Sequence, residues 1–335
     1  MEVANFLCKS VIGDVELLDI FDAYVFPAML NQEVMGSKNS ETLSYKFIDL
    51  KISKIDNQLL LSGRLVKKLN LKRQQILEGD SLVQSYDSME SAPSSFFVLI
   101  LSNHKLLWVR EVQRAPLLKD FKYAIKKMLT KQRSLLVNKY IVENSPKLFL
   151  GGNNRNEIER KAYSMYPDLD ISVTQIGSNL QIKEKLAKFY KIHNIKLSAL
   201  KRNNELGTDY SQLSKILSET QADMKAKNVV TEIKGGSLHP LNKDAVIRLV
   251  QASADGNYEY TIKGKDENNN DISESNETLS LATDIKYQDN DDSNAKIMLG
   301  KFMTITNNYN SLPRQLNDAQ EKLKKIEQNH LKRGD

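Results

Sequence analysis

The sequence predicts an α+β fold with two domains, mixed or antiparallel sheets and a helical C-terminus. Three observations support this prediction. The first half is rich in short alternating β segments, the second half mixes helix and strand patterns, and a chain of 335 residues suits two domains or one large one. Hydrophobic residues make up 40% of the chain, which is enough for a sizeable core.

The first predicted domain spans residues 1–145 and ends in a basic helix. Residues 43–56 and 57–69 alternate apolar and polar side chains, and Asp56 and Asn57 between them are typical turn residues, so we expect a hairpin. Residues 91–112 predict two further strands around a turn at 102–104. Pro116 suits the first position of a helix that should run to about Val142.

The second predicted domain spans residues 146–294 and is α+β. Pro, Gly and Asn concentrate at 144–156, which is typical of a domain boundary or hinge. Beyond it the patterns predict helices at 179–192, 209–227 and 242–254, and strands at 170–176, 228–233, 255–270 and 276–288. An acidic loop at 289–294 precedes a C-terminal helical segment, 295–335, which Pro313 interrupts.

Positive charge is concentrated in one part of the chain. The net charge is +6, but residues 64–147 hold 16 Lys and Arg against 7 Asp and Glu. The rest of the chain holds 32 basic residues against 35 acidic ones. This asymmetry suggests a polyanionic partner for the basic region.

The helix expected near residues 117–142 has one apolar stripe and an opposite face that is almost entirely cationic. Leu118, Phe121, Ile125 and Met128 recur at helical spacing, and Asp120 is the only acid among the basic residues. Those basic residues are Lys119, Lys122, Lys126, Lys127, Lys131 and Arg133. The end of the preceding hairpin adds a second cluster, formed by Arg64, Lys67, Lys68, Lys72 and Arg73.

Such a helix can be an ordinary solvated surface, or it can lie against nucleic acid, an acidic protein or a membrane surface. The pairs Lys122–Lys126 and Lys127–Lys131 repel at i,i+4 spacing, and no interleaved acids relieve them. Lysine suits phosphates, which require charge rather than a fixed geometry and carry no sequence information. We therefore predict nonspecific nucleic-acid binding, with both basic clusters contacting phosphate. Tyr123 on the same helix is interpreted as an amphipathic anchor rather than a base-stacking residue.

Motifs for catalysis are sparse. The chain has no phosphate-binding loop, no dinucleotide fingerprint and no paired histidines at metal-ligand spacing, so we expect no cofactor and no metal. The enzyme alternative is a Mg-dependent nuclease, in which Glu232 would bind the metal and Lys234 would support the attacking water. The upstream acids on offer, Asp209 and Asp223, both lie in a predicted helix. Glu-x-Lys is also the ordinary pattern of a half-exposed strand.

Two further expectations concern location and partners. Cys8 is the only cysteine and the N-terminus lacks a signal-peptide pattern, so we expect a reducing, cytoplasmic compartment. A third functional hypothesis is a non-enzymatic protein-interaction module whose C-terminal helix pairs with a partner. In that case truncation after Asn294 should abolish assembly and leave any DNA binding by the first domain intact.

Three stretches, "SFFVLILSNHKLLWVREV", "LLKDF" and "YTIKGKDENNNDI", occur between a β-rich first half and a helical C-terminus. This order resembles the RexA-like phage-exclusion proteins and bacterial proteins found among antiviral defence genes. The resemblance implies a two-domain homodimer that binds DNA with little sequence preference, acts in abortive infection and works beside a membrane-embedded effector. It also implies that segment 295–335 is a candidate dimer element, and it supplies no catalytic motif.

Overall fold

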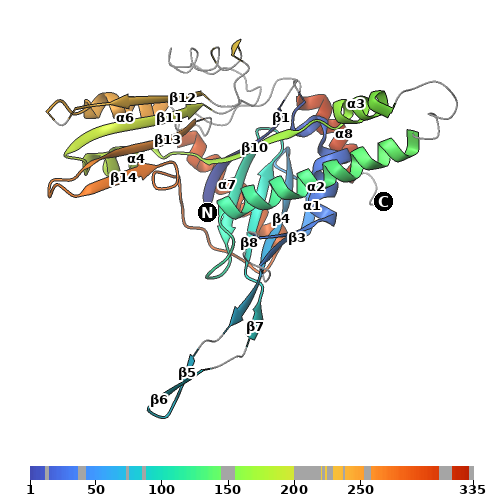
Figure 1. Ribbon diagram of the computed structural model, residues 1–335, viewed down its shortest axis with the longest axis horizontal. Helices are drawn as coiled ribbons and strands as arrows, with labels where there is room; N and C mark the ends of the chain where they lie inside the picture. The colour runs from blue at the N-terminus through green and yellow to red at the C-terminus, as the bar shows by residue number, and fades with distance from the viewer. Residues whose placement is uncertain are drawn as a thin grey trace.

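The computed structural model describes residues 1–11, 15–36, 43–72, 75–84, 88–144, 155–199, 220, 223–224, 229–236, 238–252, 258–308 and 319–331. Across these ranges the chain forms helices and antiparallel sheets, and its C-terminal part is helical, which confirms the predicted α+β fold. Figure 1 shows a large sheet crossed by a long helix, a second sheet to one side, and a narrow β arm that projects away from both.

In the described part of the chain, the larger sheet has eight strands in the order β10-β1-β9-β8-β4-β3-β2, with β7 paired to β4. All of its pairings are antiparallel. Its strands are β1 (Glu2–Ser10), β2 (Glu33–Met35), β3 (Ser44–Ile55), β4 (Gln58–Lys72), β7 (Ser88–Ser91), β8 (Ser94–Ile100), β9 (Lys105–Arg110) and β10 (Leu169–Gln175).

The hairpin predicted at residues 43–69 is present as β3 and β4. Asp56 and Asn57 form its two-residue turn with φ angles of 47° and 62°. Both angles lie in the left-handed region, which Asp and Asn tolerate better than most residues and which a tight hairpin turn requires. The turn therefore sets the register, in which Ile55 lies opposite Gln58 and Ile52 opposite Leu61.

One face of the larger sheet is covered by α2 (Leu118–Asn144), as the apolar stripe predicted. Phe121 of α2 is buried, and its ring meets the rings of Phe6, Phe47, Phe97 and Trp108 edge-on at centroid distances of 5.5 to 5.8 Å. The same core includes residues of α1 (Phe26–Asn31) and α8 (Ala319–Leu331). α3 (Arg155–Met165) lies beside α2 at the far end.

The opposite face of the larger sheet is covered by α7 (Asp291–Asn308). Met298, Leu299 and Phe302 of α7 are buried against Phe96 and Val98 of β8. The apolar side of α7 and the buried Ala319 and Ile326 of α8 are therefore used within the chain. The expectation that segment 295–335 is a dimer element therefore concerns only the sides of these helices that face away from the sheet.

The smaller sheet has the order β12-β11-β13-β14 and is antiparallel throughout. Its strands are β11 (Lys191–Ala199), β12 (Val229–Lys234), β13 (Tyr258–Lys265) and β14 (Asp271–Ser275). Helices α4 (Asn179–Ala187) and α6 (Lys243–Ala252) pack on one face of this sheet and form a separate core with it. In Figure 1 these two helices lie behind the strands.

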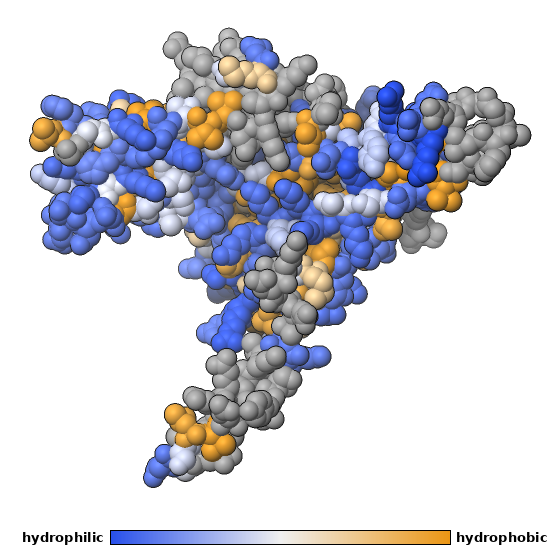
Figure 2. Space-filling view, viewed as in Figure 1, coloured by the Kyte–Doolittle hydropathy of each residue, from blue (hydrophilic) through white to orange (hydrophobic). Residues whose placement is uncertain are grey.

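A β arm extends from the larger sheet. β7 pairs with the end of β4, and the outer strands β5 (Gln75–Glu78) and β6 (Ser81–Gln84) pair with each other. Leu82 is 69% exposed, and Figure 2 shows apolar residues gathered at the tip of the arm. Residues 74–104 contain four acidic residues, Glu78, Asp80, Asp87 and Glu90, and no Lys or Arg. The arm beyond Arg73 is therefore acidic.

Strand pairing does not follow the boundary expected at residue 146. β10 lies beyond that boundary but pairs with β1 along seven residues, from Ala4 opposite Gln175 to Ser10 opposite Leu169. α7 lies still further along the chain and covers the same sheet. The smaller sheet and its two helices occupy 179–275. Long-range pairing of this kind leaves no local signal in the sequence.

Several local expectations are also corrected. The helix predicted at 179–192 ends at Ala187, and β11 begins at Lys191. Residues 276–288 form only isolated bridges rather than a strand beside β13, whose partner is β14. The acidic residues of 289–294 include the first turn of α7, which begins at Asp291. Most of the predicted helix at 209–227, and Pro313, lie outside the described residues. No helix in the described ranges is long and apolar enough to cross a bilayer.

Candidate nucleic-acid interface

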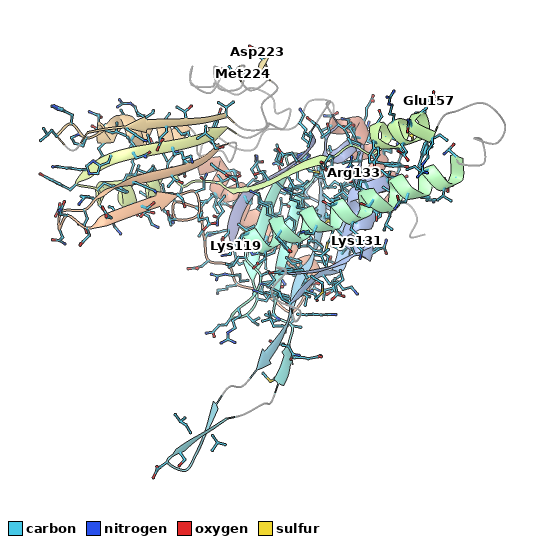
Figure 3. The ribbon with its side chains drawn as sticks, in the orientation of Figure 1. Lys119, Lys131, Arg133, Glu157, Asp223 and Met224 are labelled. Atoms are coloured by element: carbon cyan, nitrogen blue, oxygen red, sulfur yellow. The ribbon has the colours of Figure 1, made fainter. Side chains whose placement is uncertain are left out.

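The outer face of α2 presents four exposed lysines: Lys119, Lys126, Lys127 and Lys131. The buried stripe of Leu118, Phe121, Ile125 and Met128 fixes which side of α2 faces the sheet, so the four lysines point to solvent. Figure 3 shows Lys119 and Lys131 along the length of the helix. Within the described ranges, none of the four forms an ion pair with a carboxylate.

Asp120, the acid in the first turn of α2, does not pair with the lysines. Its carboxylate is hydrogen-bonded to other groups of the chain. Asp120 accepts hydrogen bonds from Tyr45 Oη at 2.8 Å and from the Leu117 backbone N–H at 2.8 Å. The second of these contacts satisfies a backbone donor at the start of the helix and suits the positive end of the helix dipole. Asp120 is therefore a capping and packing residue.

Tyr123 anchors α2 at its edge, as predicted. Its hydroxyl donates to the backbone oxygens of Met35 at 3.1 Å and Gly36 at 2.8 Å. The ammonium of Lys127 lies 5.8 Å from the centre of the Tyr123 ring, within the range of a cation–π contact. The ring thus holds one of the exposed lysines over the outer face of α2.

Two predicted phosphate ligands of α2 make contacts within the chain. Lys122 Nζ lies 3.2 Å from Glu259 Oε1 on β13, so its charge is shared with the smaller sheet. Arg133 donates through Nε to the Tyr166 backbone oxygen at 2.9 Å, and its guanidinium lies 5.3 Å from the centre of the Tyr163 ring on α3. Figure 3 places Arg133 on the α3 side of α2. Arg133 is therefore a structural residue of the α2–α3 contact.

Arg64 was predicted to contact phosphate, but in the structure its guanidinium is occupied by carboxylates of the same chain. Its guanidinium holds Asp291 with two 2.6 Å hydrogen bonds, Glu111 at 3.0 Å and Asp49 at 3.2 Å. The hydrogen bonds with Asp291 raise the pKa of Arg64, burial opposes the rise, and Glu111 adds to it. Because acidic residues from three segments surround this cation, its positive charge is already neutralised within the chain, and we do not include it in the interface.

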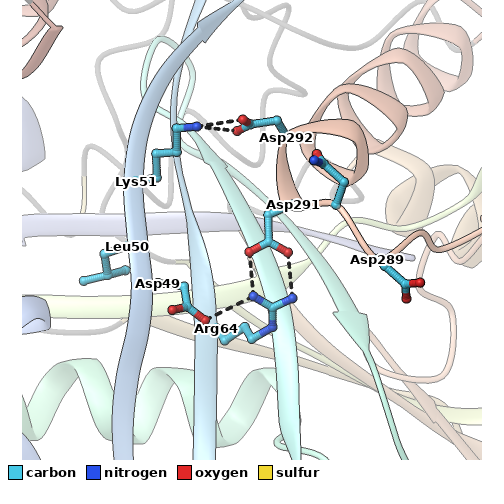
Figure 4. Close-up of a pocket in the computed structure, with 8 residues that line it drawn as sticks. Asp49, Leu50, Lys51, Arg64, Asp289, Asp291 and Asp292 are labelled. Carbon is cyan, nitrogen blue, oxygen red and sulfur yellow. Dashed lines mark hydrogen bonds and ion pairs between the residues drawn. The ribbon is translucent and has the colours of Figure 1, made fainter. Parts of the chain in front are cut away.

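The surroundings of Arg64 form an acidic pocket of about 610 Å³ (Figure 4). Its lining includes Asp49, Asp289, Asp291 and Asp292. Its second cation, Lys51, lies 2.7 Å from both carboxylate oxygens of Asp292. Both cations are thus paired, and the remaining negative charge makes this pocket unsuitable for a polyanion.

The rest of the second basic cluster is dispersed. Along β4, Leu65 packs in the core under α2 whereas Leu60 packs in the core under α7. Because successive strand residues alternate between faces, Lys67 lies on the α2 face and Lys68 on the α7 face. Lys68 Nζ also lies 3.4 Å from Glu33 Oε1. Arg73 and the side chain of Lys72 lie outside the part of the chain that the structure describes.

The nuclease residues Glu232 and Lys234 lie on β12, an edge strand of the smaller sheet. Glu232 accepts a hydrogen bond from Asn194 Nδ2 at 2.7 Å, and Lys234 Nζ lies 3.2 Å from Glu232 Oε2. The bond from Asn194, followed by that from Lys234, lowers the pKa of Glu232. Among the described residues no three His, Cys, Asp or Glu side chains gather as a metal site. Asp209 lies outside those residues.

The structure also exposes lysines that were not expected to contribute. Lys196 on β11 and Lys263 on β13 are exposed on the side of the smaller sheet opposite α4 and α6. The alternation of residues 258–265, with Tyr260 and Ile262 buried, is the sequence signal that could have identified Lys263. Using this signal would have required the knowledge that helices cover only one face of the smaller sheet.

Comparison with protein-family models, curated proteins and solved structures gave no match to this chain. In the ranges that the structure describes, the molecule is an α+β protein with an eight-stranded and a four-stranded antiparallel sheet, a two-stranded sheet in the β arm, and a lysine-rich helix on its surface.

Proposed function

We propose that this protein binds duplex DNA through the outer face of α2 with little sequence preference. The observation that carries the proposal is the group Lys119, Lys126, Lys127 and Lys131, exposed together and lacking carboxylate partners in the described structure. A surface of this kind attracts phosphates and releases the counterions bound to them, which favours association without reading bases.

The polar side chains between the lysines support nonspecific binding. Thr130 Oγ1 donates to the Lys126 backbone oxygen at 2.9 Å, and Ser134 Oγ donates to the Thr130 backbone oxygen at 3.1 Å. Both hydroxyls therefore satisfy their donors within the helix. No Arg, Asn or Gln stands beside them on the outer face between 119 and 131, and those residue types make most bidentate contacts to bases.

The dimensions of α2 suit a duplex backbone. With a rise of about 1.5 Å per residue, the lysines from 119 to 131 span about 18 Å, which corresponds to about five base pairs. Because α2 is held against the sheet by its buried stripe, these ammonium groups are presented from a rigid rod rather than from a loop. The rigid rod lowers the entropic cost of aligning several lysines with phosphates.

The resemblance to phage-exclusion proteins provides the proposed biological setting. In it the protein acts in the cytoplasm in abortive infection or antiviral defence, associates with a second copy of itself, and signals to a membrane-embedded effector. Sequence-independent DNA binding would suit recognition of invading DNA of any sequence. The apolar sides of α7 and α8 are buried within the chain, so self-association through these helices would use their exposed sides.

The proposal is tested by fluorescence anisotropy with two unrelated 30-bp duplexes. The test variant changes Lys119, Lys126, Lys127 and Lys131 to Gln. The control changes four other exposed lysines to Gln, on α4, beside it and on α7: Lys183, Lys188, Lys296 and Lys301. At about 0.1 M salt we expect the test variant to lose at least about 100-fold in affinity for both duplexes, and the control to lose less than about threefold. Equal losses in the two variants would refute the α2 interface.

A further inference from the structure

We infer that the open face of the smaller sheet extends the α2 interface, so that one duplex contacts both parts of the molecule. This inference rests on the proposed function, because it concerns the same nucleic acid. Its starting point is that α4 and α6 cover only one face of the sheet, burying Ile195, Leu197 and Ile262. The side chains that alternate with these residues therefore point to the other face.

The open face carries a group of lysines. Lys196 and Lys263 are exposed, and their strands are adjacent, with Lys196 opposite Thr261 and Lys263 opposite Asn194. This register makes the two lysines diagonal neighbours on one face. Lys234 on β12 also lies opposite Asn194 and is 68% exposed, so the three cations surround one amide.

Carboxylates on this face reduce the charge without removing it. Glu259 pairs with Lys122 of α2, Asp271 lies opposite Lys265 and 4.0 Å from its Nζ, and Glu232 is the acid nearest the three cations. Glu232 lies opposite Lys196 in the register and pairs with Lys234 at 3.2 Å. In the described structure neither Lys196 nor Lys263 forms an ion pair with an acid, and both side chains are exposed to solvent. The centre of the open face is therefore cationic.

The open face is continuous with α2. Glu259 follows the same alternation as Lys263 on β13, and its carboxylate pairs with Lys122 Nζ of α2 at 3.2 Å. In Figure 1 α2 lies in front of the larger sheet while α4 and α6 lie behind the smaller one, so the outer face of α2 and the open face of the sheet are turned the same way. The Lys122–Glu259 pair joins the two basic surfaces at their border.

A duplex fits this combined surface better than a lipid bilayer does. Figure 2 shows mainly hydrophilic residues over the smaller sheet on this side of the molecule. Val230 is the large apolar side chain that the alternation places among the exposed residues of the open face. A membrane-binding surface usually adds apolar residues that enter the bilayer, whereas phosphates along a duplex need only repeated charge.

The combined surface requires a longer duplex than α2 alone. Lys119 to Lys131 spans about 18 Å along the helix, and Glu259 to Lys263 spans about 13 Å along the strand. Together they cover about 30 Å, or about nine base pairs. A duplex much shorter than this cannot contact both parts.

The test uses the full chain with Lys196 and Lys263 both changed to Gln. The matched control changes Lys183 and Lys188 to Gln, which removes the same charge from the same domain, at α4 on the covered side. With a 20-bp duplex we expect the open-face variant to lose about tenfold in affinity, and the slope of log Kobs against log salt to become shallower by about 1.8. The control should change neither value appreciably. With a 6-bp duplex the open-face variant and the unmodified protein should bind alike.

Three outcomes would overturn the inference. One is an open-face variant that binds the 20-bp duplex like its control. Another is an equal loss on the 6-bp duplex, which would mean that the face is not an extension. The third is a loss confined to vesicles containing phosphatidylserine, which would assign the face to lipid. In each case the α2 variant would still be defective on the 20-bp duplex if the proposed function is right, so the two failures are distinguishable.

Discussion

Arg64 and Asp291 lie 227 residues apart in the sequence and form a two-point contact, with both N–O distances at 2.6 Å. The contact joins β4, in the centre of the larger sheet, to the first turn of α7. Asp291 also lies at the positive end of the α7 dipole, where a carboxylate is favourable. The Arg64 guanidinium lies 5.4 Å from the centre of the Phe96 ring, and Glu111 and Asp49 complete its surroundings. Arg64 therefore stabilises the packing of α7 against the larger sheet.

Changing Arg64 to Ala should therefore reduce stability and leave DNA binding unchanged. The Arg64 side chain is only 20% exposed, and its removal leaves Glu111, at 12% exposed, without its cation. We expect the free energy of unfolding to fall by about 2–3 kcal/mol, measured by urea denaturation. Lys51→Ala is the control, because its pair with Asp292 is more than half exposed and should contribute less than about 1 kcal/mol. Equal effects of the two changes would contradict the structural role of Arg64.

The α7 helix should be essential to the fold of the larger sheet. Phe302 is fully buried against that sheet, so Phe302→Ala should lower the free energy of unfolding by about 3–4 kcal/mol. Met303→Ala, at a side chain that is 37% exposed, should cost less than about 1 kcal/mol. Truncation after Asn294 uncovers one face of the sheet, so we expect it to abolish cooperative unfolding in urea. If the truncated chain still unfolds cooperatively, α7 is not essential to the fold of the larger sheet.

The Cys8 thiol should be unreactive in the folded protein. Burial, followed by the charge of Asp170, raises the pKa of Cys8 to about 12. At pH 8 we expect a thiol reagent to react at least about 100-fold more slowly with the folded protein than with the urea-unfolded chain. A comparable rate in both states would show that β1 is accessible.

The raised pKa of the Cys8 thiol also predicts how the free energy of unfolding changes at high pH. The unfolded thiol ionises near its ordinary pKa, whereas the folded thiol stays protonated to about 12. The stability that this group contributes is therefore intact below the ordinary pKa and is lost as the pH rises toward 12. In Cys8→Ser the free energy of unfolding, measured by urea denaturation, should therefore fall less between pH 8 and higher pH. If the variant and the unmodified protein lose the same stability over this range, other groups cause the loss.

Glu232 provides a direct test between the nuclease alternative and a basic surface. If it only offsets the charge of the open face, Glu232→Gln should raise the affinity for a 20-bp duplex by about twofold to fivefold. Hydrogen bonds from Asn194 and Lys234 lower its pKa, and even an unperturbed Glu is mostly ionised at pH 5.5, so the affinity gain should persist at that pH. Plasmid incubated with Mg²⁺ should remain intact with both proteins. Cleavage that disappears in Glu232→Gln would restore the nuclease hypothesis.

Local patterns predicted the elements that depend on neighbouring residues. Asp56 and Asn57 identified a turn because their positive φ angles are a local requirement, and the spacing of Phe121, Ile125 and Met128 identified the buried side of α2. The lysines opposite this stripe were correctly placed on the surface for the same reason. None of these predictions needed knowledge of distant parts of the chain.

Contacts between distant segments could not be predicted in this way. Arg64 looked like a member of a basic cluster because Asp291 and Glu111 are far from it in sequence. β10 appeared to belong to the second domain because its pairing with β1 leaves no local pattern. The sequence did not single out Lys196 or Lys263, because only the packing of α4 and α6 decides which face of their sheet is open.

The most direct test of the central claim is the salt dependence of duplex binding by the unmodified protein and by the variant with Lys119, Lys126, Lys127 and Lys131 changed to Gln. Each lysine that meets a phosphate contributes about 0.9 to the slope of log Kobs against log salt. We predict that the variant slope is shallower by about 3.6 and that the loss is the same for unrelated duplex sequences. An unchanged slope would show that α2 does not contact the phosphate backbone.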